Sequence, residues 1–227
     1  AAFPMVLMGW ASCSHSGTGH AALPDPRAVD KSVPEYKNPF HPSTYAHFVA
    51  RKDYRKTYDV YKDDTLLNRQ PKKSRKIFVC LDEQRGQYLV DGLVAMDFPL
   101  SSGVKAYPTK TGDYAVISKK EDHTSNLYGK MYDAEGKCIN YNAESTDPVP
   151  EGGRFDGSPM PYWQRLTNAG LGLHVGKVRR HPVSHGCVRL PRNVAEILYR
   201  QTSIGTPVTI RKTPLPVPEA QKVPAVQ

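Results

Sequence analysis

The sequence predicts a mostly β fold with a few short helices. One alternating stretch and one hairpin turn lead to this prediction. Residues 77–81 place Ile, Val and Leu on one side and Phe and Cys on the other, a pattern typical of a strand buried on both faces. Residues 88–90 and 93–98 flank the pair Asp91 and Gly92, which favours a two-residue hairpin turn. Strand follows strand with short turns between them, so the first half of the domain is expected to be all β.

The rest of the chain is expected to add loops, one helix and a last strand. We predict a turn over 84–87, short strands and loops over 121–151, and a loop rich in Gly and Pro over 148–159. Pro191 suits the first turn of a helix. A final strand is predicted over 208–210.

The length of 227 residues allows one substantial domain with flanking segments. We predict an export-signal remnant and disordered linker (1–42), a helical and basic lead-in segment (43–73), the main domain (74–212), and a disordered or extended proline-rich tail (213–227). In the lead-in segment, Tyr54, Tyr58 and Tyr61 fall at helical spacing. We expect this aromatic stripe to pack against the main domain, with a polysaccharide-binding face as the alternative.

The first residues resemble part of an export signal. Residues 3–11 are apolar and run into Trp10, Ala11, Ser12 and Cys13. Small residues directly before Cys13 resemble a lipoprotein processing site, which would anchor the chain to a membrane. Trp10 stands where an aliphatic residue is usual, and this disfavours lipidation. No later run is long enough to span a membrane.

The net charge bears on the class of partner, and the number of cysteines bears on disulfide bonding. The chain carries 31 Lys and Arg against 22 Asp and Glu, a net charge of +9, which favours anionic partners or simply a solvated basic surface. Neither an RNA-binding aromatic motif, a zinc finger nor a heptad array is present, so nucleic acid is not the expected partner. Four cysteines are too few for a disulfide scaffold. Cys80 is expected to be buried, and a Cys80–Cys138 disulfide is left open for an oxidising compartment.

The chemistry is concentrated in residues 173–191, LHVGKVRRHPVSHGCVRLP. A cysteine thiolate attacks carbonyl carbon well, but a free thiol is mostly protonated at neutral pH and needs a base or a positive charge nearby. His174, at the end of a predicted strand, and His185 could each be the base for Cys187, with Arg189 adding positive field. Gly186 lets the backbone turn sharply, and such a turn can point amide N–H groups at an oxyanion.

Two other interpretations concern the same stretch. A zinc site is the first, because His174, His181, His185 and Cys187 are all zinc-capable side chains. Gly186 argues against it, since a turn there breaks the regular extended segment that would bring these ligands to one side. A Ser184 nucleophile is the second, but no G-x-S-x-G pattern surrounds Ser184, so we expect a hydrogen-bonding turn residue.

The segment SHGCVRL (184–190), preceded by a histidine on a strand, resembles the L,D-transpeptidase (YkuD) family. Three more segments resemble that family in the same order, namely YPTKTGDY (107–114), MPYWQRL (160–166) and IGTPVTI (204–210). The resemblance spans about 74–212. It implies a YkuD-like β-sandwich or barrel and a monomeric enzyme exported to the periplasm or cell wall. Such an enzyme cross-links peptidoglycan stem peptides and needs no cofactor and no metal.

The resemblance also implies roles for single residues. Cys187 would be the nucleophile and His174 the proton donor and acceptor, with His185 a further catalytic candidate. Gly186 and Ser184 would form the oxyanion turn, and Arg189, Tyr162 and Trp163 would contact substrate. A thioester formed on Cys187 would pass to an acceptor amine. Water in place of the amine would make the protein a carboxypeptidase or endopeptidase, and a wall-binding module with a decayed site is the non-enzymatic alternative.

Overall fold

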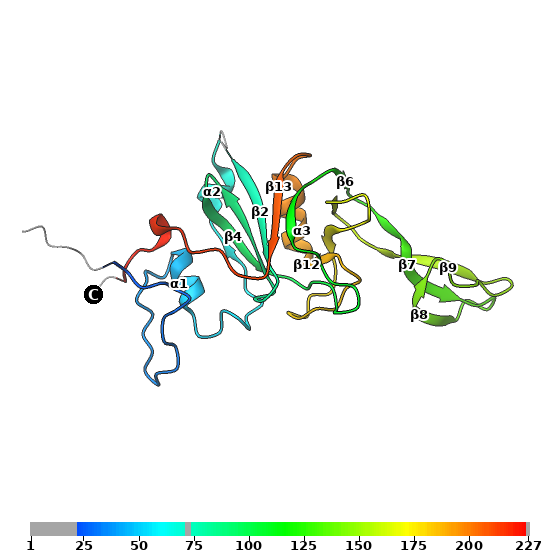
Figure 1. Cartoon of the computed structure of the whole chain (residues 1–227), viewed down its shortest axis with the longest axis horizontal. Helices are drawn as coiled ribbons and strands as arrows, with labels where there is room; N and C mark the ends of the chain where they lie inside the picture. Colours follow the sequence, from blue (N-terminus) through cyan, green and yellow to red (C-terminus); the bar gives the residue numbers. More distant parts are fainter. Residues whose placement is uncertain (1–21, 71–73, 226–227) are drawn as a thin grey trace, which may run out of the picture.

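The computed structural model describes residues 22–70 and 74–225, and strands in three sheets form most of its regular secondary structure, with a few short helices (Figure 1). The mostly β prediction is therefore confirmed. None of the helices in these two ranges is long and apolar enough to cross a membrane. Cys13 lies outside the described residues, so the anchoring prediction concerns a part of the chain that is not described.

The largest sheet has six strands. Its order is β1 (Tyr61–Lys62), β4 (Leu93–Pro99), β3 (Arg85–Val90), β2 (Arg75–Cys80), β13 (Pro207–Arg211) and β5 (Gly112–Ala115). The predicted hairpin is confirmed: Asp91 and Gly92 join β3 to β4 with φ angles of 51° and 80°, the pair of positive values that a type I′ turn requires. The strand predicted over 77–81 is present as β2, which ends at Cys80, and the predicted final strand is β13.

The predicted turn over 84–87 is wrong, because Gly86 lies inside β3. Its Cα faces Phe98 of β4, and a Cβ at this position would lie 2.3 Å from the phenylalanine ring. Glycine is present here because the ring needs the space that a side chain would fill.

A second sheet of four strands carries the reactive segment. Its order is β12 (Val188–Leu190), β11 (Gly172–Val175), β10 (Trp163–Arg165) and β6 (Ser118–Lys120). The predicted helix after Pro191 is α3 (Arg192–Gln201), whose Val194, Ala195 and Leu198 are buried. Leu173 and Val188 of this sheet, the apolar face of α3, and Ile77 of β2 belong to one hydrophobic core. The two sheets and α3 therefore hold the reactive segment as one packed unit.

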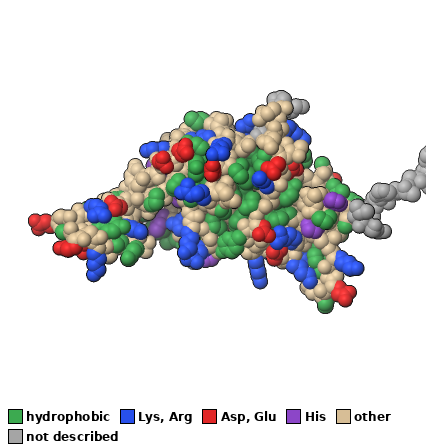
Figure 2. All heavy atoms as spheres, turned by 180° about the vertical axis from the view of Figure 1, so that it is seen from behind, with side chains coloured by type: hydrophobic (Ala, Val, Ile, Leu, Met, Phe, Trp, Pro, Cys, Tyr) green, Lys and Arg blue, Asp and Glu red, His purple; other side chains and the backbone are tan. Residues whose placement is uncertain are grey.

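The third sheet is an arm that projects from the body (Figure 1). Its order is β8 (Cys138–Glu144), β7 (Thr124–Tyr132) and β9 (Arg154–Pro159). The sequence predicted short strands and loops here, but β7 is the longest strand of the described chain. In the space-filling view the arm tapers away from the body, with acidic and basic side chains mixed along it (Figure 2). Cys138 of the arm and Cys80 of β2 are both free thiols, so the disulfide left open by the sequence is not formed.

The flanking segments pack against the large sheet, in contrast to the predicted linker and tail. Phe40 and Val217 are buried with α1 (Tyr45–Ala50) in a second core, which covers the sheet at Val94. The Gln221 side chain in a short 3₁₀ helix, η1 (Glu219–Gln221), bonds the backbone N–H and C=O of Val94 at 2.8 and 2.9 Å. A further helix, α2 (Asp64–Asn68), follows β1.

The predicted aromatic stripe of the lead-in segment divides between core and surface. Tyr54 is buried in the second core, and Tyr61 packs at its edge with a ring centroid 5.2 Å from that of Tyr45. Tyr58 is 58% exposed, so it is not part of the packing face.

A buried ion pair joins this second core to the sheet. The carboxylate of Asp97 accepts hydrogen bonds from the Arg85 guanidinium, the Tyr45 hydroxyl (2.7 Å), the Tyr54 hydroxyl (2.9 Å) and the Gln87 amide (2.9 Å). Both charged side chains are 0% exposed. Burial of a charge is costly unless it is paired and hydrogen-bonded, and here both conditions are met.

We expect Asp97→Asn to lower the free energy of unfolding by about 3–5 kcal/mol, because it leaves the Arg85 charge buried and unpaired. Urea unfolding measures this loss. Glu196→Ala is the control, since the Glu196–Arg200 pair is exposed and should contribute less than about 1 kcal/mol. Equal losses in the two variants would contradict the assigned role of Asp97.

Candidate active site

Strand register brings three predicted site residues to one face of the four-stranded sheet. β11 and β12 run parallel with His174 opposite Arg189 and Leu173 opposite Val188. Cys187 directly precedes β12 and therefore lies beside Gly172. Arg189 faces the same side as His174, because paired residues of neighbouring strands share a face of the sheet. Cys187 lies in the bend directly before β12, and the charge of Arg189 acts on the pKa of both Cys187 and His174, which places the thiol on this side of the sheet.

His174 is held as a neutral base. Its Nδ1 lies 2.8 Å from the Val175 carbonyl oxygen, which can only accept, so Nδ1 carries the proton and Nε2 keeps its lone pair. The side chain is buried, with the Trp163 ring 5.9 Å away. Burial lowers the pKa of His174 to about 4; the bond to Val175 opposes this effect, and the positive charge of Arg189 adds to it. At neutral pH the imidazole is therefore free to accept a proton at Nε2.

The Cys187 thiol is also neutral in this structure. It donates to the Gly170 carbonyl at 3.3 Å, and within the described residues no hydrogen bond joins it to an imidazole. Burial raises its pKa, while the Gly172 amide and the Arg189 charge lower it by less. In the sequence, His174, His185 and Arg189 indicated a base and a positive charge that would ionise the thiol. The structure instead has a neutral thiol and a neutral imidazole, and attack requires transfer of the thiol proton to Nε2 of His174.

Ser184 and Gly186 form the turn that precedes the thiol. The Ser184 hydroxyl donates to the Cys187 carbonyl at 2.5 Å and accepts from the Gly186 N–H at 3.2 Å. Gly186 has φ of 108°, outside the range of residues with side chains. The Gly186 N–H is thus already bonded inside the turn, which removes it from the predicted oxyanion pair. The Cys187 N–H has no partner among the described residues and is available for an oxyanion.

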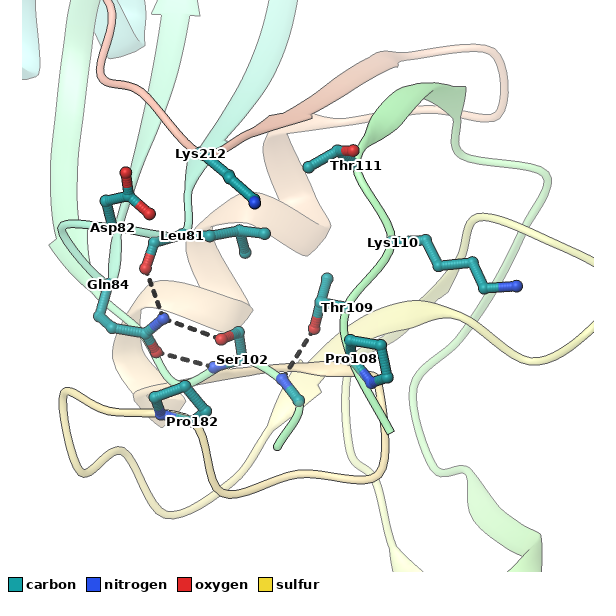
Figure 3. A pocket seen from close by; sticks show the side chains of 11 residues that line it. Leu81, Asp82, Gln84, Ser102, Pro108, Thr109, Lys110, Thr111, Pro182 and Lys212 are labelled. Carbon is teal, nitrogen blue, oxygen red and sulfur yellow. Dashed lines mark hydrogen bonds between the residues drawn. The ribbon is translucent and has the colours of Figure 1, made fainter. Parts of the chain in front are cut away.

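A second layer of hydrogen bonds supports the turn from behind. Thr109 donates to the Gly186 carbonyl at 2.6 Å and accepts from the Gly103 N–H at 2.8 Å. The Gln84 amide bonds the side chain and the backbone N–H of Ser102 at 2.8 and 2.9 Å (Figure 3). Gln84, Ser102, Gly103 and Thr109 line a cavity of about 460 Å³, together with Lys212. The turn is therefore held between the sheet and this cavity wall.

His185 lies on the outer side of the turn and contacts tyrosines. Its ring stacks on Tyr128 with centroids 4.4 Å apart and an interplanar angle of 17°, and Tyr107 lies 4.9 Å away. Its described contacts do not include the Cys187 thiol, so the structure places His185 as a contact between turn and arm rather than beside the reacting atom. Sequence reasoning missed Tyr128, because it lies in β7, far from the motif along the chain.

Over more than half of its length the chain matches a known protein family. The family model of the L,D-transpeptidase catalytic domain (YkuD) matches residues 74–210. The chain belongs to the L,D-transpeptidase catalytic domain family. A probable L,D-transpeptidase 3 of Mycobacterium tuberculosis is 31% identical over 121 residues, which is 50% of this chain and 38% of that protein. The chain thus spans well under half the length of this relative.

Solved structures of other L,D-transpeptidases are also similar to part of this chain. An L,D-transpeptidase of Mycobacterium smegmatis is 21% identical with a TM-score of 0.47, covering 61% of this chain and 58% of that one. An L,D-transpeptidase of Stackebrandtia nassauensis is 22% identical with a TM-score of 0.45, covering 73% of this chain and 65% of that one. The family assignment rests on the sequence match over 74–210.

Within this L,D-transpeptidase domain, two predicted substrate contacts lie elsewhere. Trp163 is buried beneath His174, between it and His123, and so positions the imidazole rather than presenting a surface to substrate. Tyr162 faces α3, with its ring 5.6 Å from that of Tyr199. Arg189 alone of the three predicted contacts lies on the face with Cys187, and its guanidinium has no ion-pair partner in the described chain.

The four zinc-capable side chains are not gathered into one site. His181 is exposed and its Nδ1 lies 3.3 Å from the carbonyl of Pro182, and His185 is in the tyrosine stack. In residues 22–70 and 74–225, no group of three or more His, Cys, Asp or Glu side chains is placed to hold a metal ion.

The low pKa of His174 predicts a loss of stability in acid. Because the pKa falls from 6.5 to about 4 on folding, the unfolded chain binds a proton that the folded chain does not between these values. This contribution is fully present above pH 6.5 and is lost as the pH falls towards 4. It amounts to about 3 kcal/mol at 1.36 kcal/mol per pKa unit.

Urea unfolding between pH 7 and 4 tests this prediction. The wild-type protein should lose about 3 kcal/mol more than His174→Asn over this range. His181→Asn, at an exposed position, should behave as the wild type does. If wild type and His174→Asn lose stability in parallel, the imidazole is not buried in its neutral form.

Proposed function

We propose that this chain is a cysteine-dependent L,D-transpeptidase that transfers a peptidoglycan stem peptide from Cys187 to an acceptor amine. The observation that carries the proposal is the position of Cys187 and His174 around Arg189, which pairs with His174 and acts on both groups, with Nε2 of the imidazole unprotonated and the Cys187 N–H unbonded within the described chain. Nucleophile, base and oxyanion donor are the three groups that acyl transfer needs. Family membership over 74–210 supports the same reaction.

In the first half of the reaction the thiol leaves its hydrogen bond to the Gly170 carbonyl. Its proton passes to Nε2 of His174, and the sulfur attacks the carbonyl carbon of the donor peptide. The oxyanion that forms accepts a hydrogen bond from the Cys187 N–H. The C–N bond then breaks, the protonated His174 gives its proton to the departing amine, and a thioester remains on Cys187.

In the second half an acceptor amine attacks the thioester. His174, neutral again, removes a proton from the attacking nitrogen. The C–S bond breaks, and the proton returns from Nε2 to the sulfur. The new amide is released as cross-linked product, and water in place of the amine would give hydrolysis.

Neutral partners suit a reaction that starts only when substrate is bound. Burial disfavours the thiolate–imidazolium pair in the free protein, because both members would be charged in a site with little solvent. A substrate carboxylate at Arg189, whose guanidinium is half-buried and unpaired in the described chain, would balance that charge. We therefore assign Arg189 to the substrate carboxylate.

Two further assignments follow from the proposed substrate. Peptidoglycan lies outside the cytoplasmic membrane, so we place the active protein in the periplasm or cell wall. The stack of His185 on Tyr128 supports a positioning role for His185, because it joins the cysteine turn to the arm.

Incubation with defined muropeptides followed by intact-protein mass spectrometry tests the reaction. The wild type should gain the mass of a thioester-bound stem peptide, and Cys187→Ala should gain none. Cys138→Ala, which removes a free thiol on the arm, should still form the adduct. His174→Asn should form it at least about 100-fold more slowly, the usual contribution of a general base.

The products of the same incubation decide the fate of the thioester. Cross-linked dimers support transfer to an amine, whereas trimmed peptides alone would identify a hydrolase. Cross-linking by Cys187→Ala would overturn the proposal.

A further inference from the structure

The loop between His174 and Cys187 contains an arginine that bonds three backbone carbonyls. The Arg180 guanidinium donates to the carbonyls of Thr57, Arg55 (2.5 Å) and Glu83 (3.0 Å). Arg180 adopts φ of 59°, a left-handed conformation that is uncommon for a residue with a side chain. The backbone is therefore shaped so that this side chain reaches away from the loop, towards the segment before β1.

The opposite side of the loop is already held by backbone hydrogen bonds. The N–H groups of Val183 and Ser184 donate to the Ser102 carbonyl at 2.8 and 3.1 Å, and the Arg179 N–H donates to the Ser101 hydroxyl at 2.8 Å. The bonds from Val183 and Ser184 hold the end of the loop nearest the thiol, and the bond from Arg179 holds its middle. Arg180 adds a side-chain attachment to a different part of the molecule.

The carbonyls that bind Arg180 belong to segments that are themselves held. Arg85, which pairs with the buried Asp97, also donates to the carbonyls of Thr57 (3.2 Å) and Asp59 (2.9 Å). The segment around residue 57 is therefore attached to the sheet through a fully buried side chain.

The Glu83 side chain is held by Arg27, which is in turn bonded to the segment that follows β13. Arg27 binds both oxygens of the Glu83 carboxylate at 2.8 Å, and its Nε donates to the Leu215 carbonyl at 3.1 Å. Residues 27, 55, 57 and 215 all lie outside the 74–210 range that matches the family. The segment before β1 and the turn at Glu83 thus meet the loop at the Arg180 guanidinium, and Arg27 and Leu215 support Glu83.

We infer that Arg180 is a positioning residue, through which the segment 53–59 and the turn at Glu83 hold the loop between His174 and Cys187 in its reactive shape. The inference rests on the proposed role of Cys187 as nucleophile. Arginine suits the task because its planar group presents several donors in a fixed fork, whereas the ammonium of lysine is a point charge. Small misplacements of reacting groups are costly, and about 1 Å can lower a rate about 100-fold.

Three variants test the inference. Arg180→Ala removes the three hydrogen bonds, and Arg180→Lys keeps the charge without the fork. Arg179→Ala is the matched control, because the Arg179 side chain is exposed and its backbone N–H makes the only described hydrogen bond of that residue. Thermal unfolding first establishes that each variant is folded at the assay temperature.

Two measurements read the position of the loop without any stem peptide. Hydrogen exchange should quicken in Arg180→Ala both at residues 53–59 and at residues 176–187. The pH midpoint for alkylation of Cys187 by iodoacetamide, followed on its peptide, should shift to lower pH, because a loosened turn exposes the thiol. Arg180→Lys should lie between Arg180→Ala and the wild type, and Arg179→Ala should match the wild type in both.

Acylation by a muropeptide donor provides the third measurement. It should slow about 10-fold or more in Arg180→Ala even though iodoacetamide reaches the thiol more easily. Unchanged exchange at 176–187, or an unchanged alkylation midpoint in Arg180→Ala, would overturn the inference. If Arg180→Ala does not fold, Arg180→Lys decides instead. Hydrogen exchange and an alkylation midpoint in Arg180→Lys that both equal those of the wild type would overturn the inference. If no muropeptide acylates even the wild type, the proposed function fails, while exchange and alkylation still decide the role of Arg180.

Discussion

The parallel pairing of β11 with β12 is the constraint on which the rest of the site depends. His174 and Cys187 come from different strands, and only the register that sets His174 opposite Arg189 puts imidazole and thiol on the same face. A slip of one residue would turn one of the two groups to the other side of the sheet. The register is fixed by Leu173 and Val188, whose side chains enter the common core on the opposite face. The same register of β11 and β12 is therefore required both for the catalytic geometry and for the packing of the core.

In the free protein the His174 imidazole and the Cys187 thiol are both neutral. Burial disfavours both the imidazolium and the thiolate, and the Cys187 proton is directed at a carbonyl oxygen instead of at His174. The rigid parts are those around the pair: the Ser184 hydroxyl closes the turn on itself, and Thr109 holds it from behind. Because the turn is held in place and both groups are neutral, the step that substrate binding must start is proton transfer from Cys187 to His174.

The parts of the structure that the sequence predicts are those with local causes. The Asp91-Gly92 turn needs positive φ at two successive residues, and the strand over 77–81 is buried on both faces, so both can be recognised in a few residues. The cysteine turn is similar, because Ser184, Gly186 and Cys187 bond one another. Local chemistry of this kind is visible without knowledge of the rest of the chain.

The parts that the sequence did not predict depend on contacts between distant residues. The segments 22–42 and 213–225 contain many turn-forming residues, and they pack through distant contacts: Arg27 meets Glu83, Gln221 meets Val94, and Phe40 and Val217 are buried in the second core. The arm was missed because β8 is mostly exposed and β9 contains glycine and proline, so neither alternates clearly between apolar and polar residues. For the same reason Tyr128 could not be connected to His185 before the fold was known.

The buried pair of Arg85 and Asp97 also limits how this sequence can change over generations. Loss of either partner alone strands a charge in the interior, whereas replacing the whole set by apolar side chains of similar volume is often harmless in proteins. If Arg85 and Asp97 are replaced one at a time, the first substitution gives a protein of reduced stability, because it leaves one buried charge unpaired. Because the Tyr45 and Tyr54 hydroxyls bond the same carboxylate, drift at any one of these positions is restricted by all the others.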